Sequence, residues 1–172
     1  MAASDPHPRS QPPSAAAPEC LSAPALLARL DEEIHRAERH DTKLSCLLVA
    51  IDVPHEMTPA QSEELLAQTL AYVSTALGRE LRRFDRVGRP GERELLIVLP
   101  GADGPRGEIV ARRVLDRLRT IKVEVGGARS ALDVSVGLAA WQEGMSADEL
   151  LKRTRAAAHL GNGDAVEQLT PS

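Results

Sequence analysis

The fold is decided by the stretch Phe84-Asp85-Arg86-Val87-Gly88-Arg89-Pro90-Gly91-Glu92-Arg93-Glu94-Leu95-Leu96-Ile97-Val98-Leu99-Pro100. A segment with apolar positions at 85–89 and a strongly apolar segment at 94–99 are separated by Pro90-Gly91-Glu92. Proline presets one turn dihedral and glycine tolerates backbone angles that other residues avoid, so this tripeptide favours a tight reversal. We therefore predict a β-hairpin with strands over 85–89 and 94–99.

Upstream of this hairpin, an uninterrupted apolar run covers Leu44–Ile51. A run of this length is typical of a strand that is buried on both faces, which places it at the centre of a sheet. Leucines and other apolar residues recur at helical spacing before and after it, which predicts one amphipathic helix from Pro24 to about Asp41 and a second over 62–83. Pro54 and Pro59 are expected to break the chain between the central strand and the second helix.

Downstream, residues 101–107 are expected to form a loop, followed by an amphipathic helix from about 109 to 121. Strand candidates at 121–125 and 132–139 flank Gly126-Gly127, a last helix covers about 147–160, and a short terminal strand is expected within 165–169. Helices and strands in this order predict an α/β (α+β) fold, a layered sandwich in which helices surround a mixed, mainly antiparallel sheet.

Composition narrows the classes of protein further. Residues 1–23 are rich in Pro, Ala and Ser and are predicted to be a disordered tail, which leaves 24–169 as one domain. The net charge of -4 gives no general reason to expect a nucleic acid or a membrane as partner. Cys20 and Cys46 stand alone and suggest neither a disulfide nor a metal site, and no apolar run is long enough to span a bilayer. We expect a cytoplasmic protein.

From about Leu26 to Val166 the order of elements resembles the GGDEF family of diguanylate cyclases. The family signature reads Gly-Gly-Asp/Glu-Glu-Phe, and the same five places here read Gly91, Glu92, Arg93, Glu94 and Leu95. The segment Asp-Val-Ser-Val-Gly-Leu-Ala at 133–139 also resembles the family's Thr-Val-Ser-Ile-Gly-Val-Ala strand. The resemblance implies a GGDEF or nucleotide-cyclase-like fold.

The resemblance also implies that the catalytic metal site is lost. The family joins two GTP molecules into cyclic di-GMP and needs two carboxylates to hold divalent metal. These acids would fall at positions 50 and 93, where this chain has Ala50 and Arg93. Asp52 and Glu94 match family positions, but a remaining acid beside an arginine does not rebuild a two-carboxylate site. We therefore expect no metal and no cofactor.

Substrate recognition departs from the family in parallel. The residues that read guanine in the family fall on Thr58 and Ala67, and the second glycine of the signature is Glu92, whose side chain would obstruct and repel a phosphate. The late Lys and Arg that neutralise phosphates have no clear match in 158–163. The resemblance thus predicts a protein that is not an enzyme.

One ligand site of the family is retained in sequence. Many members carry an inhibitory, product-binding Arg-x-x-Asp motif that ends six positions before the first signature glycine, and Arg82-Arg83-Phe84-Asp85 stands at this spacing from Gly91. Arginine can bond O6 and N7 of guanine, and a carboxylate can accept from its N1 and N2 donors. A further arginine on the following helix assists in the family; Arg113 falls near that place, with Arg112 as the one-residue alternative. The chain is predicted to be a cyclic di-GMP receptor.

Other interpretations remain open at this stage. Opposite charges at i and i+3 are a common surface pair on a helix, and Arg113-Val114-Leu115-Asp116 provides a second example. The domain could instead be a nucleotide-independent module that binds an unidentified protein or forms a homodimer, because we expect no fused sensory or output domain in these residues. A residual enzyme and a DNA-binding protein are the weakest alternatives, the latter because the chain is acidic and poor in aromatic residues.

Overall fold

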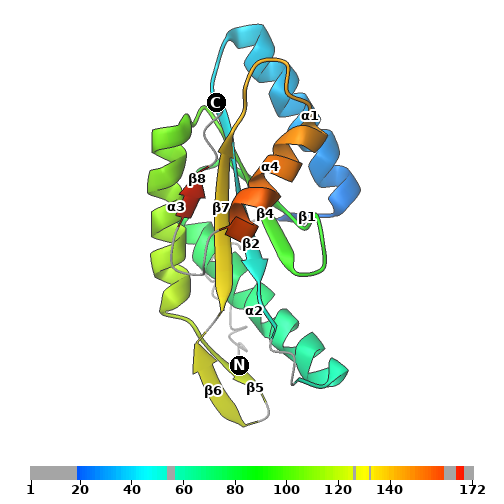
Figure 1. The fold of residues 1–172 in the computed structure, drawn as a ribbon, viewed down its shortest axis with the longest axis vertical. Coiled ribbons are helices and arrows are strands. Elements are labelled where there is room, and N and C mark those ends of the chain that lie inside the picture. Colours follow the sequence, from blue (N-terminus) through cyan, green and yellow to red (C-terminus); the bar gives the residue numbers. More distant parts are fainter. Residues whose placement is uncertain (1–18, 54–56, 126, 132, 161–165, 169–172) are drawn as a thin grey trace, which may run out of the picture.

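The computed structural model describes residues 19–53, 57–125, 127–131, 133–160 and 166–168. These residues form four helices and eight strands (Figure 1). The elements follow in the order β1 (Cys20–Leu21), α1 (Ala23–His40), β2 (Leu44–Ile51), α2 (Pro59–Glu80), β3 (Arg86–Gly88), β4 (Glu94–Pro100), α3 (Gly104–Arg119), β5 (Lys122–Val125), β6 (Ala128–Ala131), β7 (Val134–Ala140), α4 (Ala147–Leu160) and β8 (Val166–Gln168).

The main sheet is built around β2. Its described strands lie in the order β1-β3-β4-β2-β7-β8. β2 runs antiparallel to both β4 and β7, β3 is antiparallel to β4, and the edge strands β1 and β8 add parallel pairs. All eight residues of β2 are buried, as predicted from the continuous apolar run.

Helices cover both faces of this sheet (Figure 1). One face of β2 and β4 packs with apolar residues of α2 and α3, and the other packs with α1 and α4. On the second face α4 lies close to the backbone of β7. This approach requires glycine at position 137, because an added Cβ would lie 2.6 Å from the carbonyl oxygen of Thr154. The layered fold with a mixed, mainly antiparallel sheet is thus confirmed.

The second helix begins and ends earlier than expected. α2 covers Pro59–Glu80 rather than 62–83. Thr58 and Gln61 form a reciprocal capping box, and Pro59 occupies the first turn, where its missing N–H costs nothing. The expectation that Pro59 breaks the chain was therefore wrong at this residue, since it starts the helix.

The expected loop at 101–107 was also wrong in part. α3 begins at Gly104, because the side chain of Asp103 caps the helix by accepting from the Arg106 backbone N–H at 2.9 Å. Further on, β5 pairs with β6 in a separate two-stranded sheet, whereas β6 was not predicted. The Gln68 side chain ties this hairpin to α2 by donating to the Glu124 carbonyl at 2.8 Å.

The two ends of the chain are described only in part. β1 lies within the segment predicted as a tail and pairs with β3, so the ordered chain starts before residue 23; residues 1–18 lie outside the described residues. β8 falls within the terminal strand predicted at 165–169.

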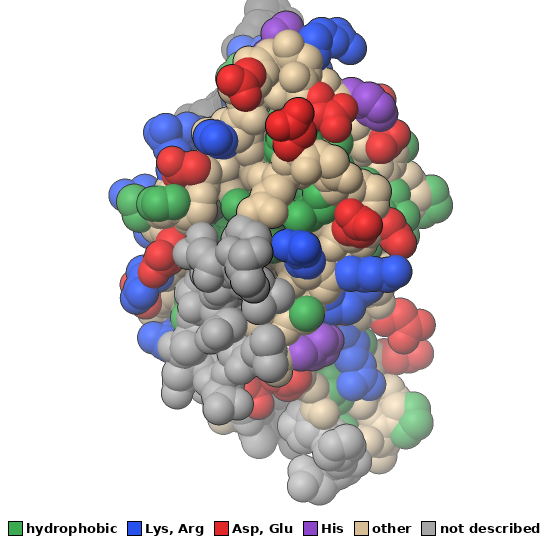
Figure 2. Space-filling model, turned by 45° about the horizontal axis from the view of Figure 1, so that its top comes forward, with side chains coloured by type: hydrophobic (Ala, Val, Ile, Leu, Met, Phe, Trp, Pro, Cys, Tyr) green, Lys and Arg blue, Asp and Glu red, His purple; other side chains and the backbone are tan. Residues whose placement is uncertain are grey.

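None of the described helices combines the length and apolarity that crossing a membrane requires. Figure 2 shows acidic and basic side chains interspersed on one face of the molecule.

Candidate functional site

The Arg-x-x-Asp motif forms a tight turn between α2 and β3. The helix is capped at Leu81, and the backbone N–H of Arg82 then donates to Asp85 Oδ2 at 2.7 Å. The backbone N–H of Asp85 donates in return to the Arg82 carbonyl at 3.1 Å. Arg82 and Asp85 are therefore joined by a side chain-to-backbone turn. The alternative of a helical i, i+3 surface pair is wrong, because α2 has ended before the motif begins.

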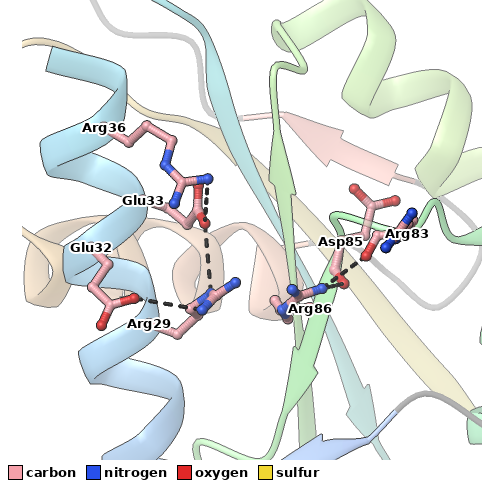
Figure 3. A network of polar contacts seen from close by, with 7 residues as sticks. All are labelled: Arg29, Glu32, Glu33, Arg36, Arg83, Asp85 and Arg86. Atoms are coloured by element: carbon pink, nitrogen blue, oxygen red, sulfur yellow. Dashed lines mark hydrogen bonds and ion pairs between the residues drawn. The ribbon is translucent and has the colours of Figure 1, made fainter. Parts of the chain in front are cut away.

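Arg86 closes the other side of this turn. Its Nη1 donates to the carbonyl oxygens of Arg83 and Asp85 at 2.9 and 3.0 Å (Figure 3). These bonds satisfy carbonyls that follow the helix and lie outside any strand. The turn is thus fixed by Asp85 and Arg86, while the side chains of Arg82, Arg83 and Phe84 are exposed.

The carboxyl group of Asp85 lies in a mixed electrostatic environment. Its partial burial raises its pKa above the usual 3.8, and the hydrogen bond from Arg82 together with the charges of Arg82 and Arg86 opposes this rise. A carboxylate offers about four acceptor positions, and the Arg82 backbone N–H occupies one of them. It can therefore still accept hydrogen bonds from a ligand.

A pocket of about 820 Å³ lies between this turn and α1. Arg82, Arg83, Asp85 and Arg86 line one side of it, and the first half of α1 lines the other. Its volume falls in the range of pockets that hold small molecules, ~300–1,000 Å³. The motif therefore opens on a cavity of ligand size rather than on a flat surface.

The two arginines predicted on α3 do not line this pocket. Neither Arg112 nor Arg113 is among its described lining residues. Both are exposed, and Arg112 is held by Glu108 one helical turn away, with an Nη2 to Oε1 distance of 2.9 Å. Arg117 of α3 forms an ion pair with Glu80, the last residue of α2, at 3.0 Å. The structure thus brings Arg82 and Asp85 together but does not bring Arg112 or Arg113 to the pocket.

The tip of the β3–β4 hairpin carries a different arrangement. Ala50 of β2 pairs with Glu94 of β4, and the backbone N–H of Ile51 donates to the Arg93 carbonyl at 2.8 Å. The side chain of Arg93 is exposed. Among the described residues, no three His, Cys, Asp or Glu side chains gather closely enough to hold a metal ion.

Glu94 is bound by a residue that the sequence did not single out. Arg155 of α4 donates through Nε and Nη2 to the two oxygens of Glu94 at 2.8 and 2.7 Å, and this contact raises the pKa of Arg155. The geometry is a bidentate pair. No local pattern marks Arg155, because its partner lies 61 residues away. Glu94 is therefore occupied by an ion pair within the chain.

Comparison with known families decides the identity of the fold. The family model described as "Diguanylate cyclase, GGDEF domain" matches residues 24–160. The chain belongs to the GGDEF family. This family is related to diguanylate cyclases.

Solved structures agree with this assignment. The diguanylate cyclase SiaD of Pseudomonas aeruginosa, in complex with its activator SiaC, is 26% identical with a TM-score of 0.78; the match covers 90% of this chain and 62% of that chain. The GGDEF domain of PA1120 (YfiN or TpbB) from the same organism is 17% identical with a TM-score of 0.75, covering 89% of this chain and 98% of that chain.

A third GGDEF structure contains c-di-GMP. The GGDEF domain of DgcB from Caulobacter crescentus, in complex with c-di-GMP, is 18% identical with a TM-score of 0.70, covering 95% of this chain and 98% of that chain. At this identity the likeness shows the fold alone. No curated protein sequence matches the chain.

The Glu94–Arg155 pair is expected to stabilise the packing of α4 on the sheet. In a double-mutant cycle with Glu94→Gln and Arg155→Met, the free energy of unfolding should show a coupling of about 1 to 2 kcal/mol, because both groups are half-buried and bidentate. The exposed pair Asp148–Lys152 on the same helix is a matched control. Asp148→Asn and Lys152→Met should couple by ~0.5 kcal/mol or less. Urea denaturation measures both, and equal couplings would contradict the structural role.

Proposed function

We propose that this GGDEF domain is catalytically inactive and binds cyclic di-GMP at the turn Arg82–Asp85. The observation that carries the proposal is the construction of this turn beside a pocket of about 820 Å³. The turn is held by the Asp85 carboxylate and by Arg86, so that the guanidinium of Arg82 is not needed to maintain it. An exposed arginine on a rigid turn, next to an acid, is suited to recognising a guanine base.

The proposed contacts follow from the chemistry of the two side chains. Arg82 would donate to O6 and N7 of guanine, and Asp85 would accept from N1 and N2. Asp85 already accepts one backbone hydrogen bond on Oδ2, but a carboxylate has about four acceptor sites and retains capacity for the base. Arg113, with Arg112 as the alternative, would contribute from α3 only if the ligand extends beyond the pocket. The other arginines of the turn would offset the phosphate charge.

Catalytic inactivity is proposed from the hairpin and the strand opposite it. Alanine at position 50 supplies no metal ligand, and Arg93 places a positive charge where the family has an acid. The remaining acid, Glu94, is engaged by both donors of Arg155. A divalent metal would have to displace an arginine to reach a single carboxylate, which is a poor site for a hard cation. We further propose that the protein acts in the cytoplasm.

Binding is tested by calorimetric titration with cyclic di-GMP. Wild-type protein should bind, and Arg82→Ala should weaken binding about 10-fold or more without lowering the melting temperature, because only the backbone of Arg82 supports the turn. The control is Arg39→Ala, which removes an exposed arginine of α1 that does not line the pocket and should change affinity less than about 2-fold. No binding at high micromolar ligand, or equal affinity in wild type and Arg82→Ala, would overturn the proposal.

The pH dependence of binding follows from Asp85. The pKa of the Asp85 carboxyl lies above 3.8, so this group takes up its proton at a higher pH than an ordinary aspartate does. Only the ionised form can accept from both guanine donors, and affinity should therefore be full above this pKa and fall as the pH drops through it. Asp85→Asn should bind more weakly but without this step. Titrations between pH 3.5 and 7, with circular dichroism to monitor folding, measure it; an equal slope in both proteins would argue against Asp85.

Inactivity is tested directly with GTP and Mg²⁺. Pure protein should form no cyclic di-GMP above a no-protein control, because the metal site lacks its two acids. The diguanylate cyclase SiaD serves as the active comparison. Product that scales with protein concentration and disappears with EDTA would show that the chain is an enzyme.

A second candidate is a nucleotide-independent interaction module. It is favoured by exposed apolar side chains, of which Phe84 at the turn is 67% exposed, and by the SiaD structure, in which a GGDEF protein is bound to a protein activator. We expect such a module to bind its partner equally with and without cyclic di-GMP. A partner captured by wild type and by Arg82→Ala alike, but lost in Phe84→Ala, would support this function.

A further inference from the structure

The wall of the pocket opposite the turn carries one arginine, Arg29 of α1. It extends from α1 toward β3, where Arg86 lines the same pocket (Figure 3). Ala25 and Ala28, on the same face of the helix, also line this wall and leave the space in front of Arg29 open. Arg29 is thus placed to contact a molecule that also contacts the turn, although it lies more than 50 residues away in sequence from Arg82.

The donors of Arg29 are poorly satisfied by the protein itself. Its Nε is buried and has no hydrogen-bond partner. The closest acids, Glu33 and Glu32, lie at 3.6 Å from Nε and from Nη1 respectively. These distances exceed those of charge-assisted hydrogen bonds, ~2.7–2.9 Å. An arginine that is half-buried yet makes only long ionic contacts on its own helix is able to donate to an additional acceptor.

The charge across the pocket indicates which acceptor would fit. Four arginines and three carboxylates are among the described residues that line it. Arg86 is committed to the carbonyls of the turn, and Arg29 faces it from α1. Glu32 and Glu33 offset the charge of Arg29 only at 3.6 Å, and four arginines against three carboxylates leave the lining with a net positive charge that favours an anion. A phosphate oxygen meets this need and suits the planar geometry of arginine.

We infer that Arg29 binds a phosphate group of the nucleotide whose guanine lies on Arg82 and Asp85. This inference rests on the proposed function and adds a residue to it from a different part of the chain. The ligand then spans the pocket from the turn to α1. The Nη groups of Arg29 donate to the phosphate, while its buried Nε stays beside Glu33.

Three variants test the role of Arg29. Arg29→Ala should weaken cyclic di-GMP binding about 10-fold or more, and Arg29→Lys should recover part of the loss because it restores the charge but not the two-donor geometry. Arg39→Ala is the matched control, since Arg39 is an exposed arginine on the same helix that does not line the pocket. It should bind within about 2-fold of wild type. Melting temperatures establish that each variant is folded, and inorganic pyrophosphate is titrated in parallel as a probe without a base.

The outcomes separate this inference from the proposed function. If cyclic di-GMP binding needs Arg82 but is unchanged in Arg29→Ala, the inference is wrong and the proposed function stands. If cyclic di-GMP does not bind but pyrophosphate binds in an Arg29-dependent way, the proposed function is wrong and the phosphate site stands. If cyclic di-GMP does not bind, and pyrophosphate either does not bind or binds wild type and Arg29→Ala equally, both the inference and the proposed function are overturned.

Discussion

The burial of β2 on both faces and along both edges is the constraint on which the rest of the structure depends. Its eight residues are all buried, and its backbone is paired with β4 on one side and β7 on the other. A one-residue slip would move apolar side chains from one helical layer to the other, so the register is strongly specified. This register sets Ala50 opposite Glu94 and thereby fixes where the hairpin tip meets the sheet.

Sequence patterns predicted those parts of the fold that depend on nearest neighbours and on burial. The apolar run 44–51, the hairpin and the helical periodicities each correspond to an element of the structure. Helix starts were missed where a capping side chain extended the helix, as at Thr58 and Asp103. The strand β6 was missed because its residues, Ala128–Ala131, have no apolar alternation and obtain their place from pairing with β5.

The residues of the candidate sites show the same difference between local patterns and tertiary contacts. Arg82 and Asp85 were singled out by the resemblance to the family and by their spacing to Gly91, whereas the turn that joins them was not predicted, because the helix was expected to run to residue 83. Arg155 and Arg29 could not be singled out from the sequence, since each is marked only by a neighbour in the folded structure. For Arg155 this neighbour is Glu94, and for Arg29 it is the turn across the pocket. For such residues the chain offers no spacing rule, because the distance along the sequence is set by the fold. Long side chains that act between elements are therefore the part that requires a structure.

The two regions of this domain can change independently because different hydrogen bonds hold them. β3 pairs with β4 at Leu96–Val98, which is two or more residues beyond the tip residues 93 and 94. The turn before β3 is held by the hydrogen bonds of Asp85 and Arg86. The exposed side chain of Arg93 and the ion pair between Glu94 and Arg155 take part in neither set of bonds. Side-chain changes at the tip are thus compatible with an intact turn, because the hydrogen bonds that hold the turn do not reach residues 93 and 94.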